Sequence, residues 1–168
     1  MIGFVELFLP LIVSNVLHMF VVKYDQFAWF KVPISSRLFG ANKTWRGFVF
    51  VGLVTACCQL ALSHLLDEVF RPQSFWLGLI LGLTYMSCEL PNSYMKRRLG
   101  IGAGAQADRH AWFFVILDKS DSTFGVCLVF VLYKGLTWTN FIQLFIAAFV
   151  IHMSLSKALQ LLRVKESL

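Results

Sequence analysis

The chain has few charged residues for its length. Of its 168 residues only 14% are Asp, Glu, Lys or Arg, whereas 58% are hydrophobic. A soluble domain contains about 25% charged and about 45–50% apolar residues, so this composition excludes an ordinary soluble domain. The surplus apolar surface must face lipid, and the chain is too short for two membrane bundles. We therefore expect one integral membrane domain over residues 1–168. Two copies of this domain could assemble as a homodimer.

Cysteine is also scarce, and its spacing excludes a zinc site. Cys57 and Cys58 are adjacent within an apolar run, while Cys88 and Cys127 stand alone in two others. None of these spacings matches a zinc-ligand pattern, so small buried thiols are the simpler interpretation. The apolar N-terminus lacks a basic leader and a small-residue cleavage site, which predicts a retained span and not a signal peptide.

Long apolar segments dominate what the chain does contain. A transmembrane helix needs about 20 mostly apolar residues, and five segments come close to this length. They are residues 2–22, 47–66, 74–90, 111–133 and 139–158. The sequence thus predicts an all-α membrane protein, a bundle of about five transmembrane helices. Residues 26–39, in the first loop, mix aromatic and basic side chains as headgroup-layer segments do, and Pro33 excludes one continuous helix there.

Basic residues are concentrated in alternate loops. The first loop, the third loop and the C-terminal tail contain Lys23, Lys31, Arg37, Lys43, Arg46, Lys96, Arg97, Arg98, Arg109, Lys157, Arg163 and Lys165. The two connections on the other side contain only Arg71 and Lys134. The positive-inside rule then places those loops and the C-terminus in the cytoplasm and the N-terminus outside. We expect a plasma (inner) membrane protein whose chemistry faces the cytoplasm.

Three carboxylates lie within the predicted spans: Glu89 in the third, and Asp118 and Asp121 in the fourth. Ionisable groups inside a membrane are costly, so they are functional candidates by default. The i, i+3 spacing puts Asp118 and Asp121 on one helical face, which Gly125 continues and where it would let another helix approach closely. Such a pair, without a neighbouring His or Cys, suits a hard cation such as Mg²⁺. Alternatively, the two aspartates only pair with Lys119 or with other basic residues.

Two basic blocks flank the predicted spans. They contain Asn42, Lys43, Thr44 and Arg46 before the second span, and Ser93, Lys96, Arg97 and Arg98 after the third. Each block could bind phosphate groups, or could only set topology and contact anionic lipid. Their glycines lack the preceding strand and the spacing of a dinucleotide-binding or Walker loop. Asn15, His18 and His152 are scattered over the spans without ligand spacing, and we expect them to be satisfied buried groups.

These blocks together resemble the CDP-archaeol synthase family, integral membrane relatives of phosphatidate cytidylyltransferase. The resemblance is carried by R-L-F-G-A-N-K-T-W-R-G at residues 37–47, S-Y-M-K-R-R-L-G-I at 93–101 and L-D-K-S-D at 117–121. It extends over about residues 5–165, nearly the whole chain. The first two motifs are each fairly specific, and their combination with a later D-x-x-D is more specific than either motif alone.

The resemblance implies a five-helix membrane fold and the transfer of a cytidylyl group from CTP to a phosphorylated lipid alcohol, with release of pyrophosphate. It also implies Mg²⁺ as the cofactor. By position, it assigns catalysis to Asp118, Asp121, Lys96 and Arg97, and substrate or nucleotide binding to Asn42, Lys43, Thr44, Arg46, Ser93 and Arg98. The metal ligands would be Asp118, Asp121 and Glu89, although relatives commonly have Asp where this chain has Glu89.

Two alternative interpretations stay open. A phosphatidate cytidylyltransferase making CDP-diacylglycerol would use the same chemistry on another acceptor, although the chain is short for that family. A non-enzymatic membrane transport or binding protein would also use intramembrane carboxylates, but its polar groups should continue to the outer face, where the second and fourth spans are nearly pure hydrocarbon. The expected partners are CTP, a phosphorylated lipid alcohol and membrane lipids, and no nucleic acid.

Overall fold

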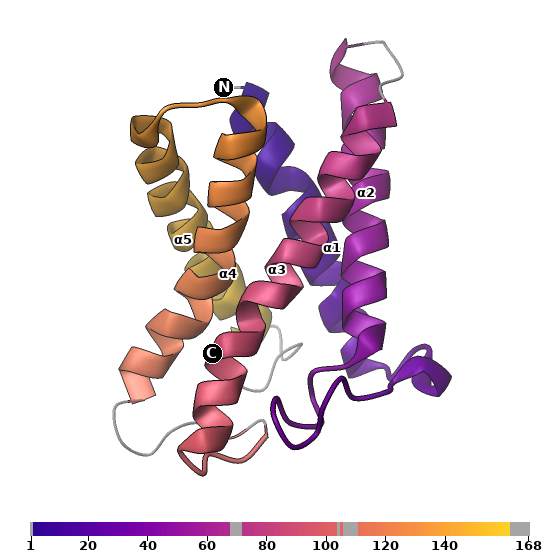
Figure 1. Cartoon of the computed structure of the whole chain (residues 1–168). Coiled ribbons are helices and arrows are strands. Elements are labelled where there is room, and N and C mark those ends of the chain that lie inside the picture. Colours follow the sequence, from indigo (N-terminus) through magenta and orange to yellow (C-terminus); the bar gives the residue numbers. More distant parts are fainter. Residues whose placement is uncertain (1, 68–71, 104, 106–110, 162–168) are drawn as a thin grey trace.

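The computed structural model describes residues 2–67, 72–103, 105 and 111–161, which form five long helices (Figure 1). The helices are α1 (Ile2–Lys23), α2 (Trp45–Asp67), α3 (Pro72–Arg98), α4 (Ala111–Lys134) and α5 (Trp138–Leu161), with a three-residue 3₁₀ helix, η1 (Ala28–Phe30), in the first loop. Successive long helices run in opposite directions along the bundle. The predicted all-α architecture with five helices is therefore confirmed.

Three of these helices are long and apolar enough to cross a membrane, among the residues described. They are Gly3–Lys23, Trp45–Leu66 and Trp138–Leu161. The other two have similar lengths, about 40 Å for the 27 residues of α3 and about 36 Å for the 24 residues of α4. They are less apolar because α3 contains Glu89 and a basic C-terminal end, and α4 contains Asp118, Lys119 and Asp121. The chain is an integral membrane protein with three candidate spans, and its two remaining helices contain the polar groups of interest.

The third helix extends past the apolar segment that predicted it. The sequence placed the span at residues 74–90, just before Pro91, but α3 continues through Pro91 to Arg98. A proline within a helix lacks an N–H and crowds the carbonyl four residues earlier, yet neighbouring helices make it tolerable in membrane proteins. The basic block therefore lies on the last two turns of α3 and not in a loop, so its side chains are arranged with helical spacing.

Small residues let α3 approach both of its neighbours closely. A methyl group on Gly78 would lie 2.7 Å from the Cα of Ala56 and from the carbonyl oxygen of Thr55, so these α2 backbone atoms are in direct contact with α3. On the other side, a methyl group on Gly125 would lie 2.2 Å from Cys88 Sγ. The predicted role of Gly125 in a close helix approach is thus confirmed, as in small-residue packing of membrane helices generally.

Replacing Gly78 by alanine is expected to destabilise the bundle. The added methyl group collides with backbone atoms that no side-chain rotation can move, and overpacking of this kind costs about 1–3 kcal/mol. Thermal unfolding in detergent measures the loss. Gly3→Ala is the matched control, because its methyl group would lie 3.8 Å from the Phe130 ring, an ordinary contact. An unfolding temperature for Gly78→Ala equal to that of Gly3→Ala would contradict the close α2–α3 contact.

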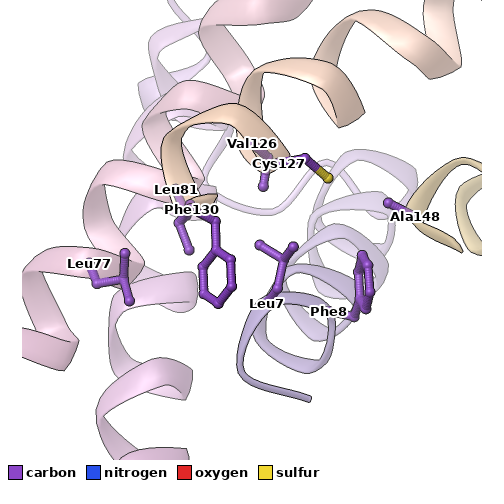
Figure 2. Packing of buried hydrophobic residues seen from close by; sticks show 8 residues of the cluster. All are labelled: Leu7, Phe8, Leu77, Leu81, Val126, Cys127, Phe130 and Ala148. Carbon is purple, nitrogen blue, oxygen red and sulfur yellow. The ribbon is translucent and has the colours of Figure 1, made fainter. Parts of the chain in front are cut away.

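The apolar core lies toward the end of the bundle where α1 begins. Figure 2 shows side chains from α1, α3, α4 and α5 meeting there. The cluster consists of Leu7, Phe8, Leu77, Leu81, Val126, Cys127, Phe130 and Ala148. Since the residues from α1 and α3 come from the first turns of those helices, the core leaves the opposite end of the bundle, where α3 ends and α4 begins, available for polar groups.

The first loop is held against the start of α2 by Arg46. The buried guanidinium group donates hydrogen bonds to Asp25 Oδ1 at 3.0 Å and to the Gln26 carbonyl at 2.7 Å. Hydrogen bonds from Lys31 and Arg46 lower the pKa of Asp25, which therefore stays ionised at neutral pH. Further along, the Ile34 N–H donates to the Lys43 carbonyl at 2.9 Å, so the loop folds back on itself before α2 starts.

The rest of the first loop agrees with an interfacial position. The η1 helix has only three residues, and the segment after it is not helical, so the exclusion of a continuous helix by Pro33 is confirmed. Trp29 is 81% exposed and Phe27 is more than half exposed, as expected for side chains that face headgroups. Arg71, Arg109, Arg163 and Lys165, which contributed to the predicted orientation, lie outside the described residues.

Candidate active site

A cavity of about 340 Å³ opens at the end of the bundle opposite the apolar core. Seven of the predicted site residues line it: Asn42, Lys43, Glu89, Ser93, Lys96, Arg97 and Asp118. They come from the first loop, from α3 and from α4, so segments that are far apart in the sequence share one space. Thr44, Arg46, Arg98 and Asp121 are not among the lining residues.

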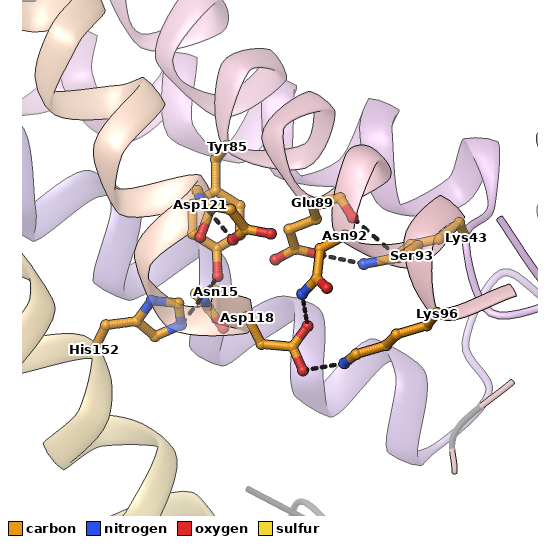
Figure 3. A network of polar contacts seen from close by, with 11 residues as sticks. Asn15, Lys43, Tyr85, Glu89, Asn92, Ser93, Lys96, Asp118, Asp121 and His152 are labelled. Carbon is orange, nitrogen blue, oxygen red and sulfur yellow. Dashed lines mark hydrogen bonds and ion pairs between the residues drawn. The ribbon is translucent and has the colours of Figure 1, made fainter. Parts of the chain in front are cut away.

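Two ion pairs cross the cavity (Figure 3). Lys43 Nζ contacts Glu89 Oε2, and Lys96 Nζ contacts Asp118 Oδ2. Burial acts to lower the pKa of Lys43, but the Glu89 carboxylate outweighs it, with smaller contributions from the aspartates, so the pKa is raised. Lys43 therefore remains protonated at neutral pH. Each pair joins two different elements and neutralises a carboxylate that the membrane would otherwise disfavour.

The helical spacing on α3 explains why its residues converge. Glu89, Ser93, Lys96 and Arg97 follow one another at i, i+4, i+7 and i+8, which is a single helical face. The first loop reaches this face through Gly40, whose φ of +88° is a conformation that favours glycine. A methyl group there would lie 3.5 Å from Arg97 Nη1, so the loop tip packs directly on the basic block.

The two aspartates of α4 occupy different depths. Asp118 lines the cavity and accepts a hydrogen bond from Asn92 Nδ2. Asp121 lies one turn deeper, about 4.5 Å further along the helix, and its Oδ1 accepts from the Ser122 N–H at 2.5 Å. The i, i+3 spacing thus keeps both on one side of α4 but exposes only Asp118 to the cavity.

The site contains buried oxygen atoms that no donor satisfies. Asp121 Oδ2 and Asn92 Oδ1 have no hydrogen-bond partner within the described residues. Carboxylate and amide oxygens are the ligand atoms that Mg²⁺ and Ca²⁺ prefer, so the donor set fits a hard cation. The same part of the chain contains no group of three or more His, Cys, Asp or Glu residues placed to hold a metal ion by themselves. The remaining ligands of a bound Mg²⁺ would therefore have to be water or substrate.

Three predicted site residues have other contacts. Arg98 is exposed beside Tyr94: its guanidinium lies 5.4 Å from the ring centroid, and Nε donates to the tyrosine hydroxyl at 2.9 Å. Arg46 holds the first loop, as described above, and buried Thr44 forms the backbone bridge with Pro33. Their predicted contact with substrate stays a prediction.

Sequence reasoning missed several polar residues near the cavity, among them His18, which lines the cavity. Asn15, Tyr85 and His152 line it, and Asn92 binds Asp118. Asn15 and His152 are hydrogen bonded, as expected of satisfied groups, but their position at the cavity was not anticipated. One signal was available on α1, where Asn15, His18, Met19 and Val22 share one helical face at i, i+3, i+4 and i+7. Tyr85 lies four residues before Glu89, on the same face of α3, and His152 shares a face of α5 with Ser156 at i+4. Spacing could therefore have indicated these faces, but only helix packing brings them to the cavity.

Comparison with known proteins identifies one family. The family model described as CarS-like CDP-archaeol synthase matches residues 5–168. A CDP-archaeol synthase of Saccharolobus islandicus is 26% identical over 130 residues, which cover 77% of this chain and 72% of the relative. The enzyme of the same name from Methanopyrus kandleri is 30% identical over 105 residues, 62% of this chain and 55% of the relative. No solved structure matches the chain.

Proposed function

This chain belongs to the CDP-archaeol synthase family, and we propose that its 340 Å³ cavity is where a cytidylyl group passes from CTP to a lipid phosphate. Family membership makes the chain a CTP-dependent cytidylyltransferase of lipid biosynthesis. The single observation that best supports the location is the meeting of Lys43, Lys96 and Arg97 with Glu89 and Asp118 in one cavity between the membrane helices.

The reaction needs charge neutralisation more than proton transfer. An oxygen of the lipid phosphate attacks the α-phosphorus of CTP and forms a new P–O bond, while the bond to the bridging oxygen breaks and pyrophosphate leaves with the electron pair. A phosphate monoester is already mostly a dianion at neutral pH, with a second pKa near 6, so the attacking oxygen has no proton to lose. No general base is required. Lys43, Lys96 and Arg97 would hold the anionic phosphate groups of both substrates.

We assign any bound Mg²⁺ to Asp118 and Asp121, with the Asn92 carbonyl oxygen as a further ligand atom. Glu89, the third predicted ligand, does not form a three-carboxylate group with them among the described residues. Mg²⁺ in enzymes is usually held by one or two carboxylates together with substrate phosphates and water, which agrees with an incomplete protein ligand set. When bound, the ion would supply Lewis-acid stabilisation of the charge that develops on the phosphate oxygens. Lys43 pairs with Glu89 and Lys96 pairs with Asp118, so the cations that would hold phosphate lie beside the carboxylates at the site.

The cavity is proposed to face the cytoplasm of the cell, at the plasma (inner) membrane. Lys43 of the first loop and Lys96 and Arg97 of the α3 end line the cavity, at the end of the bundle where α3 ends. At the other end Lys134 is paired with Glu6 at 2.7 Å, so among the described residues the charge of this lysine is balanced. By the positive-inside rule the cavity end is cytoplasmic, which is where CTP is available.

The test is pyrophosphate release by the detergent-purified protein with CTP, Mg²⁺ and a panel of phosphorylated lipids. The panel contains dialkyl-ether and diacyl-ester glycerol phosphates and is run with and without a chelator. Release that requires one lipid class and stops when the metal is chelated would support the reaction and name the acceptor. A preference for the diacyl ester would favour the phosphatidate enzyme. Folded protein that releases no pyrophosphate with any lipid would contradict the proposal.

A further inference from the structure

A second, apolar cavity adjoins the polar one deeper in the bundle. It measures about 50 Å³ and is lined by α1, α3, α4 and α5, with Phe8, Leu11 and Ile151 among its apolar residues. Four residues line both cavities: Asn15, Tyr85, His152 and Leu155. These residues therefore mark the boundary between a space suited to phosphates and a space suited to hydrocarbon.

Three of the boundary residues are linked in one series of side-chain hydrogen bonds. Asn15 Nδ2 donates to the Tyr85 hydroxyl, which lies 3.3 Å from His152 Nε2. On the far side of the ring, His152 Nδ1 lies 3.4 Å from Thr123 Oγ1, whose own hydrogen is donated to the Lys119 carbonyl at 2.5 Å. Figure 3 shows Asn15, Tyr85 and His152 meeting beside Asp118 and Asp121. The three side chains come from α1, α3 and α5, so tertiary packing alone brings them together.

Which group donates and which accepts can be assigned along this series of hydrogen bonds. Because Thr123 Oγ1 gives its hydrogen to a carbonyl, it can only accept from His152, so Nδ1 bears the ring hydrogen. Nε2 is then an acceptor toward the Tyr85 hydroxyl, which also interacts with the Glu89 carboxylate, and the hydroxyl oxygen accepts from Asn15. The polar groups of Tyr85 and His152 are thus engaged with other groups of the protein. The group that remains for a ligand is the Asn15 amide, with its second N–H and its carbonyl oxygen.

We propose that Asn15, positioned by Tyr85 and His152, recognises the glycerol backbone of the acceptor lipid. This inference rests on the proposed function. The apolar cavity, at about 50 Å³, has room for only the first one or two carbons of a chain. A lipid whose phosphate lies among Lys43, Lys96 and Arg97, and whose first chain carbons lie against this cavity, therefore has its backbone at the boundary between the two. The ether or ester oxygens of a glycerol backbone accept hydrogen bonds. The second N–H of Asn15, which donates to no other group among the described residues, is the donor that meets this need. Tyr85 and His152 act as positioning residues.

Lipid binding without CTP tests this recognition separately from catalysis. The thermal stabilisation of purified protein is titrated with a dialkyl glycerol phosphate and with a monoalkyl phosphate that has the same chain length but no glycerol. Wild-type protein should prefer the glycerol lipid, and Asn15→Leu should lose about tenfold in affinity for it with little change for the monoalkyl phosphate. Tyr85→Phe should lose affinity for the glycerol lipid about three- to tenfold, since it frees the Asn15 amide from its partner.

The matched control is Tyr94→Phe, which removes the same hydroxyl from the same helix. Tyr94 lines neither cavity, and its hydroxyl accepts a hydrogen bond from Arg98. The affinity of the Tyr94→Phe protein for both lipids should therefore equal that of wild type. In turnover, Tyr85→Phe should raise the KM for lipid and leave the KM for CTP unchanged. Equal losses for both lipids, or a rise in the KM for CTP, would overturn the proposal. Wild-type protein that binds the glycerol lipid selectively but releases no pyrophosphate would retain the recognition site while removing the proposed function.

Discussion

Replacing Asp121 by asparagine is expected to reduce cytidylyl transfer by about a thousandfold or more without weakening the fold. Asp121 Oδ2 is buried and receives no hydrogen bond within the described part of the chain, and asparagine keeps the Oδ1 that accepts from the Ser122 N–H, so the fold should persist. Loss of a cation-binding carboxylate removes several kcal/mol of transition-state stabilisation, and about 4 kcal/mol corresponds to a factor of about a thousand. Steady-state pyrophosphate release measures the first effect, and thermal unfolding measures the second.

Asp25→Asn is the matched control for this experiment. The substitution is the same, but Asp25 is half exposed in the first loop, where it pairs with Lys31 and Arg46 and lies outside the cavity. The exposed pair with Lys31 contributes about 0–1 kcal/mol. Arg46 is buried but keeps its hydrogen bond to the Gln26 carbonyl, so turnover by this variant should stay close to that of wild type. Unchanged turnover in Asp121→Asn would remove Asp121 from the site and leave Asp118 as the only α4 carboxylate in it.

Replacing Lys96 by alanine is expected to lower kcat/KM for CTP about 10- to 100-fold while the protein keeps its orientation in the membrane. Lys96 lines the cavity and is paired with Asp118, and a hydrogen bond to a charged group contributes about 1.5–3 kcal/mol. The orientation should persist because Arg97 and Arg98 remain at the same end of α3. Kinetics with varied CTP and cysteine-labelling of the loops measure the two properties on the same preparation.

Arg98→Ala provides the comparison that separates catalysis from topology. It removes one positive charge only two residues away, but from a side chain that contacts the Tyr94 ring and does not line the cavity. If the basic block serves only topology, the two variants should behave alike. If Lys96 binds substrate, Lys96→Ala alone loses CTP use. An inverted orientation with normal kinetics in Lys96→Ala would favour the purely topological interpretation.

Most of the fold could be predicted from sequence because a lipid environment constrains it strongly. Apolar segments of about 20 residues have few structural options in a membrane, and all five became helices within a few residues of the predicted bounds, apart from the longer α3. The extension through Pro91 was missed because the local rule that proline ends a helix was overridden by packing against α2 and α4.

The chemistry of the candidate site could be predicted from the sequence, but which residues line the cavity could not. Motif and charge indicated phosphate-binding cations beside intramembrane carboxylates. Neighbours such as Arg97 and Arg98 look equivalent in sequence, yet helical residues one apart point in directions about 100° different, so only Arg97 lines the cavity. The same geometry places Asp118 at the cavity and Asp121 beneath it.

The sequence by itself determined that this is a helical membrane protein with a polar end and that its chemistry concerns phosphates. Composition, the length of apolar segments and the order of motifs are properties of the chain alone, so no contact had to be known. Only the tertiary structure decided that Lys43 pairs with Glu89, that Lys96 pairs with Asp118, and that Asn15, Tyr85 and His152 meet between two cavities. Those partners are 22 to 70 residues apart, and spacing along a helix specifies a face without specifying which other helix packs against it.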